Sequence, residues 1–263
     1  MKADVYSNDG KKSGEISLPS LFEEPVRLGL IARAAISDQT KQYQPKAPYK
    51  RAGMQTSAKY RGRKDDYGSI KNKGIAMLPR EVLPKGRFGK VRRIPSSVKG
   101  RRAHPPKVEK IIIEKINKKE YMKALRSALA ATASSEYIIA RGHKLPAKFS
   151  LPIIFDETCE NIEKTKIAQK LLNAIGINDD LKRGKKSKKR SGVRTRKGGK
   201  RRPKSLLLVV EDAKSKFAHA ARNIAGIDVV SAKELKVLDL APGAKAGRLA
   251  AYTKKALDEL AKK

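Results

Sequence analysis

The stretch Leu206-Leu-Leu-Val-Val210 is the longest purely aliphatic run in this chain of 263 residues. Charged residues lie just outside it, at Lys204 and Glu211. A short apolar run between charged residues is typical of a central parallel strand, because such a strand is buried on both of its faces. We therefore predict that this stretch lies inside a mainly parallel sheet.

Further strand and helix patterns lie on both sides of this stretch. Short strands are predicted at residues 3–6, 15–18, 151–155, 228–230, 237–240 and 249–252. Helices with apolar residues every three or four positions are predicted over 25–39, over 117–133, around 168–175, around 218–226 and over about 253–261. Alternating strands and helices are typical of an α/β fold. We predict a doubly wound, mainly parallel sheet with helices on both faces.

Two basic insertions interrupt these patterns. Residues 41–107 hold 20 lysine and arginine residues against Asp65, Asp66 and Glu81, with seven glycines and seven prolines. Residues 182–204 hold 14 lysine and arginine residues and no acidic residue. Together they carry most of the formal net charge of +36. We predict a globular domain of residues 1–40 and 108–263, a long extended loop at 41–107 and a second basic insertion at 182–204.

The charge of the insertions predicts a polyanionic partner, because lysine and arginine side chains neutralise the phosphates that dominate nucleic-acid binding. The first insertion also contains aromatic residues among its cations, namely Tyr43, Tyr49, Tyr60, Tyr67 and Phe88. Aromatic rings and arginine side chains stack on unpaired bases, which favours irregular, folded RNA. A basic linker in solvent would have no need of these rings. We predict an RNA-binding loop.

The residues that we expect to bind RNA are cations of the two insertions together with one histidine. In the first insertion they are Lys50, Arg51, Lys59, Arg61, Arg63, Lys71, Lys73, Arg80, Lys85, Arg87, Arg92, Arg93, Lys99, Arg101, Arg102, His104 and Lys107. In the second they are Lys189, Arg190, Arg194, Arg196, Arg201 and Arg202. Both segments lack the apolar density that offsets a backbone entropy cost of about 1–2 kcal/mol per residue, so we expect RNA to order them.

Patterns for catalysis or cofactor binding are missing from the sequence. Neither Gly-x-Gly-x-x-Gly nor a phosphate-binding Gly-x4-Gly-Lys-Ser/Thr motif occurs. The three histidines are scattered, and the single cysteine, Cys159, lies beside Glu157 and Glu160, which disfavour a thiolate. The acidic pairs Asp65-Asp66 and Asp179-Asp180 lie in loop-like, basic surroundings that disfavour general-acid chemistry. We expect no enzymatic activity, cofactor or metal.

Cysteine usage and the absence of a long apolar run bear on location. One cysteine permits no disulfide within the chain, which fits a reducing, intracellular setting. We expect no signal peptide, membrane span or membrane partner.

Two rival functions remain consistent with the charge. One is an RNA-modifying enzyme with a pocket in the α/β domain, which the missing glycine-rich turn disfavours, and the other is a nucleic-acid packaging protein.

Several stretches of the chain also resemble one protein family. They are Leu18-Pro-Ser-Leu-Phe-Glu-Glu-Pro-Val-Arg27, Ala52-Gly-Met-Gln-Thr-Ser-Ala58, Lys99-Gly-Arg-Arg-Ala-His-Pro-Pro-Lys107, Ile116-Asn-Lys-Lys-Glu120, Ala124-Leu-Arg-Ser-Ala-Leu-Ala-Ala-Thr-Ala133, Arg141-Gly-His143, Ala221-Arg-Asn-Ile-Ala-Gly226, Leu240-Ala-Pro-Gly243 and Gly247-Arg-Leu249. These stretches, in this order along the chain, resemble the archaeal and eukaryotic form of the large-subunit ribosomal protein four family.

The resemblance implies a structural, cytoplasmic protein of the ribosome. Its implied partners are large-subunit ribosomal RNA, neighbouring ribosomal proteins and the nascent peptide near the loop tip. It implies a loop that threads through that RNA toward the peptide exit tunnel, with residues 61–80 nearest the nascent chain. Within them the tunnel-tip candidates are Arg63, Tyr67, Lys71, Lys73 and Met77. The chain departs from the family's compact, glycine-rich tip in having a longer segment at 62–74 and an extension at 81–90.

Overall fold

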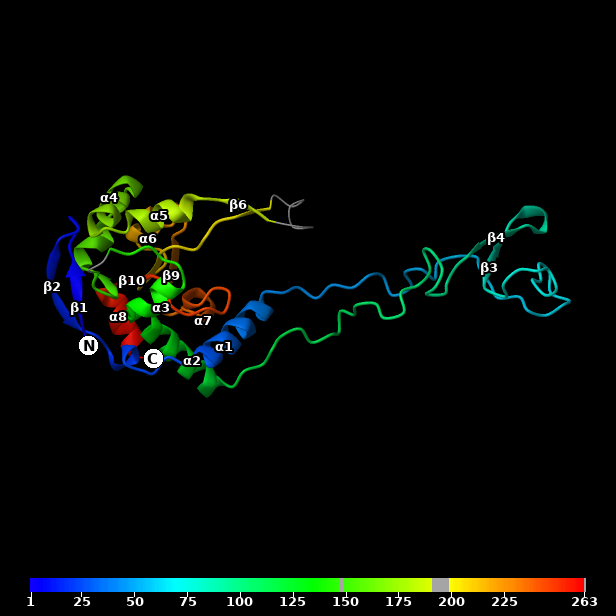
Figure 1. Cartoon of the computed structure of the whole chain (residues 1–263), viewed down its shortest axis with the longest axis horizontal. Coiled ribbons are helices and arrows are strands. Elements are labelled where there is room, and N and C mark those ends of the chain that lie inside the picture. The colour runs from blue at the N-terminus through cyan, green and yellow to red at the C-terminus, as the bar shows by residue number, and fades with distance from the viewer. Residues whose placement is uncertain (147–148, 191–198, 263) are drawn as a thin grey trace. The chain divides into compact units, whose positions relative to one another are not determined.

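A computed structural model describes residues 1–146, 149–190 and 199–262 of the chain. It comprises two compact units. The first unit is Met1–Gln42 with Ile113–Lys263, and the second is Tyr43–Ile112. The second unit overlaps the predicted insertion at residues 41–107. The sheet and its covering helices belong to the first unit (Figure 1).

The first unit is built on a six-stranded sheet in the order β2-β1-β5-β10-β8-β9. Its strands are β1 (Lys2–Tyr6), β2 (Lys12–Ser17), β5 (Ile153–Phe155), β8 (Leu207–Val210), β9 (Asp228–Ser231) and β10 (Ala250–Thr253). The edge strand β2 is antiparallel to β1, and every other pairing is parallel. The predicted mixed fold with a mainly parallel sheet is confirmed.

Strand β8 is the aliphatic stretch that the sequence placed inside the sheet. All four of its residues are buried, and it lies between β10 and β9. Leu207 and Val209 point into one hydrophobic core, and Leu208 and Val210 point into a second. Because successive side chains of a strand point to opposite faces, the two cores lie on opposite sides of the sheet.

Helices fill both cores. Those that bury residues in the first core are α1 (Leu28–Lys41), α2 (Lys118–Ala133), α7 (Val237–Leu240) and α8 (Lys254–Ala261). Those that bury residues in the second are α3 (Ser135–Ala140), α4 (Thr165–Ile175), α5 (Asn178–Lys185) and α6 (Lys216–Ala221). Two short 3-10 turns, Ser20–Phe22 and Glu157–Asn161, complete the first unit.

Local signals explain several helix ends. Gly176, with a φ of 100°, ends α4 in the left-handed conformation that glycine adopts without strain. The Thr253 hydroxyl accepts a hydrogen bond from the backbone N–H of Ala256 and caps α8. Asn117 and Glu120 have the spacing of a capping box, but Asn117 precedes α2 without a side-chain hydrogen bond. Helix α1 begins at Leu28, after the proline where the pattern placed its start.

The predicted strand at residues 237–240 is wrong, because this segment is the short helix α7. Val237 and Leu240 are both buried, and their spacing of three residues places them on one side of a helix. The Asp239 carboxylate accepts a hydrogen bond from the backbone N–H of Lys236, which supports the first turn. Helix α6 also ends earlier than its pattern indicates, at Ala221, and a turn leads to Gly226.

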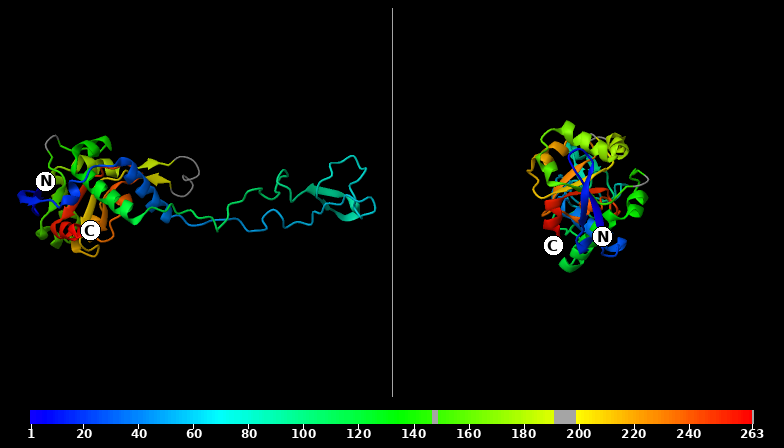
Figure 2. Two further views of the ribbon diagram at one scale, coloured as in Figure 1. Left: turned by 90° about the horizontal axis from the view of Figure 1, so that it is seen from below. Right: turned by 90° about the vertical axis from the view of Figure 1, so that its left-hand side faces the viewer.

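The second unit contains two short antiparallel strands, β3 (Arg80–Val82) and β4 (Phe88–Val91), joined through a 3-10 turn at Pro84–Gly86. An isolated bridge pairs Lys59 with Arg80. Two extended segments run beside one another in both views of this unit (Figures 1 and 2). They approach closely at Gly53, where a Cβ atom would lie 2.6 Å from the Arg101 Cα atom.

The central position of β8 makes its side chains sensitive to truncation. We expect Leu208→Ala, at a side chain that is 1% exposed, to lower the free energy of unfolding by about 2–5 kcal/mol, because it removes buried methyl groups and leaves a cavity. Ile139→Ala, at a side chain that is 61% exposed, is expected to change it by less than about 0.5 kcal/mol. Urea unfolding measures both, and equal effects would contradict this role for β8.

Candidate nucleic-acid interface

Most of the cations expected to bind RNA are exposed in the second unit. The exposed ones are Lys50, Arg51, Lys59, Arg63, Lys71, Lys73, Lys85, Arg87, Lys99, Arg101, Arg102, His104 and Lys107. The partly buried ones are Arg61, Arg80, Arg92 and Arg93. The exposed side chains are available to phosphates, whereas the partly buried ones also take part in the local fold.

The partly buried arginines surround the β3–β4 hairpin. The Arg93 guanidinium donates to the carbonyl oxygen of Ala58 at 3.2 Å. Glu81 accepts a hydrogen bond from the Thr56 hydroxyl at 2.9 Å and pairs with Arg92 Nε at 3.4 Å. Among the described residues, one guanidinium nitrogen in each of Arg61, Arg80 and Arg93 is buried without a hydrogen-bond partner. Such donors are stabilised by any acceptor that reaches them.

Aromatic side chains of the second unit are mostly exposed. Tyr43, Tyr49, Tyr60 and Tyr67 are exposed, with Tyr67 the most exposed at 74%. Phe88 differs, because the Lys73 ammonium lies 5.4 Å from the centre of its ring. A cavity of about 450 Å³ between the two extended segments is lined by Tyr49, Pro105 and Pro106 among others. The flat faces of exposed tyrosine rings accept stacked bases.

The tunnel-tip candidates lie in the segment that precedes β3. Arg63, Tyr67, Lys71, Lys73 and Met77 are all exposed. Behind them Ile70 is 3% exposed, and its backbone N–H donates to the Arg61 carbonyl oxygen at 3.2 Å. The segment is therefore anchored by a buried side chain while its polar side chains face outward.

The second insertion includes a short hairpin of β6 (Lys188–Lys189) and β7 (Lys200–Arg201). Lys188 lies opposite Arg201, and Lys189 opposite Lys200, so like charges face one another across the strands. Such pairs are destabilising, and an anion beside them offsets the repulsion. The expected RNA-binding residues Lys189, Arg190, Arg201 and Arg202 are exposed here. Arg194 and Arg196 lie outside the described residues.

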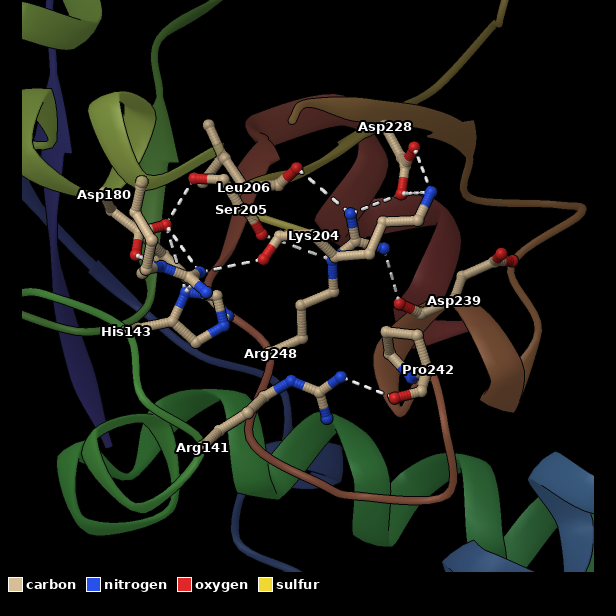
Figure 3. A network of polar contacts seen from close by, with 12 residues as sticks. Arg141, His143, Asp180, Lys204, Ser205, Leu206, Asp228, Asp239, Pro242 and Arg248 are labelled. Atoms are coloured by element: carbon tan, nitrogen blue, oxygen red, sulfur yellow. Dashed lines mark hydrogen bonds and ion pairs between the residues drawn. The ribbon is translucent and has the colours of Figure 1, made fainter. Parts of the chain in front are cut away.

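A buried polar network holds the base of this hairpin (Figure 3). Asp180 of α5 is its centre, with a side chain that is fully buried. Its carboxylate accepts hydrogen bonds from Arg183 Nε at 2.8 Å, from the Ser205 hydroxyl and from His143 Nδ1 at 3.1 Å. Arg183 also donates to the Lys204 carbonyl oxygen at 2.8 Å, which ties α5 to the residue where the insertion ends.

Arg248 forms the other half of the network, with only 1% of its side chain exposed. Its guanidinium pairs with Asp228 at 2.5 Å and donates to the Asp239 carbonyl oxygen at 2.9 Å. It also donates to the Ser205 carbonyl oxygen at 3.3 Å. The Lys204 ammonium reaches the same Asp228 carboxylate at 2.7 Å. Charge-assisted hydrogen bonds thus fix the start of the second insertion to α5 and its end to β9.

Burial and charge set the protonation of this network. Burial alone would raise the pKa of Asp180, but hydrogen bonds from His143, Arg183 and Ser205 hold it below its ordinary value. Burial lowers the pKa of His143 more than the neighbouring Asp180 raises it, so the imidazole is neutral at neutral pH. Its Nδ1 then donates to Asp180, and its Nε2 accepts from the Leu249 N–H at 3.4 Å.

The position of the network argues for a structural role. Its members lie at the amino ends of the parallel strands β8, β9 and β10, whereas ligands of open α/β sheets bind beyond the carboxyl ends. At the carboxyl end of β5, the Asp156 carboxylate is paired with the Lys254 ammonium at 2.5 Å. Burial raises the pKa of the Cys159 thiol to about 11, which disfavours the thiolate.

The described part of the chain offers neither a metal-binding cluster nor a membrane-spanning helix. Across residues 1–146, 149–190 and 199–262, no three histidine, cysteine or carboxylate side chains are grouped as a metal site would require. None of the helices in those residues combines the length and apolar content of a membrane span.

The network was not predicted from the sequence. The pair Asp179-Asp180 was placed in a loop, but both residues lie in the first turn of α5. Asp179 is exposed as expected, whereas Asp180 points inward, because successive residues of a helix face different directions. The available signal was the four-residue spacing of Ile177 and Leu181 on either side of these acids, which is typical of an amphipathic helix.

Comparison with known proteins places this sequence in a family. The sequence profile of the Ribosomal protein L4/L1 family matches residues 16–263. The chain belongs to this family. It is 44% identical over 262 residues to the large ribosomal subunit protein uL4 of Methanocaldococcus jannaschii, covering 99% of this chain and 98% of that protein.

Two further archaeal relatives carry the same description. Large ribosomal subunit protein uL4 of Methanococcus vannielii is 42% identical over 262 residues, covering 99% of this chain and 98% of its own length. That of Natronomonas pharaonis is 40% identical over 265 residues, covering both proteins fully. The family predicted from the sequence is confirmed, and the expectation of a non-enzymatic ribosomal protein agrees with it.

The network predicts unequal roles for two adjacent carboxylates. We expect Asp180→Ala to lower the free energy of unfolding by about 3–5 kcal/mol, because Arg183 loses its buried partner. Asp179→Ala is the matched control. Asp179 is 72% exposed and pairs only with Lys182 on the surface, so a loss within about 1 kcal/mol is expected. Equal losses of unfolding free energy for the two variants, measured by urea unfolding, would show that the buried network does not stabilise the fold.

Neutral His143 predicts a dependence of stability on pH. Its folded pKa lies below the unfolded value, so only the unfolded chain takes up this proton as the pH falls below about 6.5. Stability from this group is therefore full above that pH and declines below it, by up to about 1.4 kcal/mol per pH unit. We expect His143→Gln to flatten this part of the pH profile in urea unfolding. An unchanged slope would mean that His143 is not held neutral.

Proposed function

We propose that this protein is a structural component of the large ribosomal subunit that binds large-subunit ribosomal RNA and supports its assembly. The observation that carries the proposal is the separation of charge from fold. The first unit holds a buried sheet and two hydrophobic cores, while exposed cations are concentrated in the second unit and in the β6–β7 hairpin. Such segments gain most from a phosphate-rich partner.

The second unit supplies the three kinds of contact that folded RNA needs. Exposed lysines and arginines neutralise phosphates, and exposed tyrosines stack on unpaired bases. The unpaired buried nitrogens of Arg61, Arg80 and Arg93 would gain acceptors if phosphates or base edges reach the hairpin. We therefore assign the expected RNA-binding residues of both insertions to this role, with Arg92 and Arg93 also supporting the local fold.

We further propose that the second unit extends toward the peptide exit tunnel, where Arg63, Tyr67, Lys71, Lys73 and Met77 approach the nascent peptide. Their exposure in one segment and its anchoring by buried Ile70 support this role. Neighbouring large-subunit proteins are the other partners that we propose. The protein would act in the cytoplasm as part of the ribosome, in agreement with the family.

We also infer that the sheet is doubly wound. The chain moves from β5 to β8 and β9 in one direction across the sheet and then returns to β10. The helices α4, α5 and α6 that connect the outward steps pack in one core, and α7 of the return step packs in the other. Reversing direction together with face keeps the crossovers right-handed, which supports this winding.

Replacing two exposed arginines tests the role of the second unit. We expect Arg101→Ala/Arg102→Ala to weaken binding to a transcript of large-subunit ribosomal RNA. The slope of log affinity against log salt should become shallower by about 1.4, since each contact with irregular RNA contributes about 0.7. Both side chains are exposed, so the thermal unfolding of the first unit should not change. Unfolding of that unit would make these arginines structural.

Lys216→Ala/Lys255→Ala is the control, because these lysines pair with Glu163 and Glu160 on the first unit. It should leave RNA affinity close to that of the native protein.

Co-sedimentation with large ribosomal subunits after a high-salt wash separates the rival functions. A protein that leaves the subunits and follows bulk nucleic acid would be a packaging protein, and binding of a nucleotide or methyl donor would indicate an enzyme. Either result contradicts the proposal.

A further inference from the structure

The solvent-facing side of α2 is mainly cationic, with Glu120 as its one partly exposed acidic residue. Its exposed residues are Lys118, Lys119, Lys123 and Arg126. The exposed residues of α4, α5 and α8 include neutral or acidic ones, such as Asn173, Asp179 and Asp258. The pattern of α2 therefore differs from that of an ordinary solvated helix, on which charges of both signs are mixed. These four residues lie outside both insertions and were not among those expected to bind RNA.

The lysines of this face carry free charge. Within the described ranges, Lys118, Lys119 and Lys123 have no acidic partner within 4.0 Å. The one acidic residue of α2, Glu120, pairs with Arg33 of α1 at 3.3 Å. By contrast, Lys255 of α8 is held by an acidic side chain at 2.8 Å. An unpaired cation has more to gain from a phosphate than one that is already neutralised.

The helix that carries these lysines is firmly fixed to the first unit. The Tyr121 hydroxyl donates to the Asp38 carboxylate of α1 at 2.7 Å, and the Ser127 hydroxyl donates to the Pro25 carbonyl oxygen at 2.9 Å. Every residue from 127 to 133 is buried. Because the backbone is held on one side, the cations on the other side form a preorganised surface, and binding there costs little backbone ordering.

The spacing of the cations suits an RNA strand. Lys119, Lys123 and Arg126 are four and three residues apart, which places them on one side of the helix. Along the helix axis these steps are about 6 Å and 4.5 Å, at 1.5 Å per residue. A row of this kind can contact successive phosphates of one strand without reading the bases.

We propose that the exposed face of α2, formed by Lys118, Lys119, Lys123 and Arg126, is a further binding surface for backbone phosphates of large-subunit ribosomal RNA. The inference rests on the proposed function and adds a rigid contact to the two basic insertions. Whereas the extended segments adapt to the RNA, this surface fixes how the first unit is oriented on it. It contributes affinity and orientation without sequence specificity.

Lys119→Ala/Lys123→Ala tests this surface. Alanine favours helix more than lysine does, so α2 should remain folded, which thermal unfolding checks. We expect the salt dependence of binding to a large-subunit RNA transcript to become shallower by about 1.4–1.8, at about 0.7–0.9 for each phosphate contact. The Lys216→Ala/Lys255→Ala control, which removes the same charge, should retain the native slope.

Different results of this experiment contradict the α2 surface and the proposed function. A steep slope in the native protein with an unchanged slope in the α2 variant overturns the inference and leaves the proposed function standing. An equal reduction in the control also overturns the inference, because it would report net charge alone. A flat slope in the native protein contradicts the proposed function as well.

Cross-linking distinguishes RNA from an acidic protein as the occupant of this face. Cys159 is buried, so Lys119→Cys introduces one accessible thiol for a short photo-crosslinker. After incorporation into large subunits, we expect cross-links from this position to RNA and far fewer from the control Lys255→Cys. Cross-links to protein alone, or equal yields from both positions, would overturn the assignment to RNA.

Discussion

Repulsion among 62 lysine and arginine residues, against 26 acidic residues, is the constraint on which the arrangement of this chain depends. The acidic residues of the first unit are used largely as partners for nearby cations, as in Asp156 with Lys254 and Asp228 with Arg248. The surplus of cations occupies the second unit and the β6–β7 hairpin, where side chains are exposed. The sheet can therefore fold without the polyanion, whereas the basic segments depend on it to offset their repulsion.

The buried network at the amino ends of the parallel strands joins the sheet to the second basic insertion. Asp180, Arg183 and Arg248 connect α5 and the end of the second insertion to the amino ends of β8 and β9. Removing one partner would leave an uncompensated charge in the interior, so the network commits the insertion to one point of attachment. The β6–β7 hairpin is thus held at its base by buried contacts, and helix α2 presents further cations on a backbone that is already ordered.

Much of the first unit could be predicted from the sequence, because local periodicity determines it. The aliphatic run of β8 and the apolar repeats of α2 and α4 reflect burial directly. The strand predicted at residues 237–240 failed because Tyr121 and Asp239 stabilise a helical turn that four apolar and acidic residues do not specify. The β3–β4 hairpin was also missed. Its strands are short, and the glycine and proline residues around them obscure the alternation of apolar and polar side chains.

The sequence identifies which cations belong to the candidate interface, but it shows only partly how exposed each one is. Exposure of the insertion cations follows from their lack of apolar neighbours. The partial burial of Arg93 beside Ala58 depends on a contact between residues far apart in the chain, and so does the burial of Asp180 beside His143. The cations of α2 were overlooked because its apolar repeat describes the opposite, buried face. Non-local packing decides which charges are free and which are already neutralised.

The central claim is that the sheet folds by itself while RNA orders the basic segments. Hydrogen exchange of backbone amides, measured on the free protein and on the protein within large ribosomal subunits, tests it most directly. The account predicts that β8 and β10 are protected in both states, and that residues 43–58 and 94–112 exchange rapidly in the free protein and slowly in the subunit. Equal protection of these segments in both states, or rapid exchange in the subunit, would contradict it.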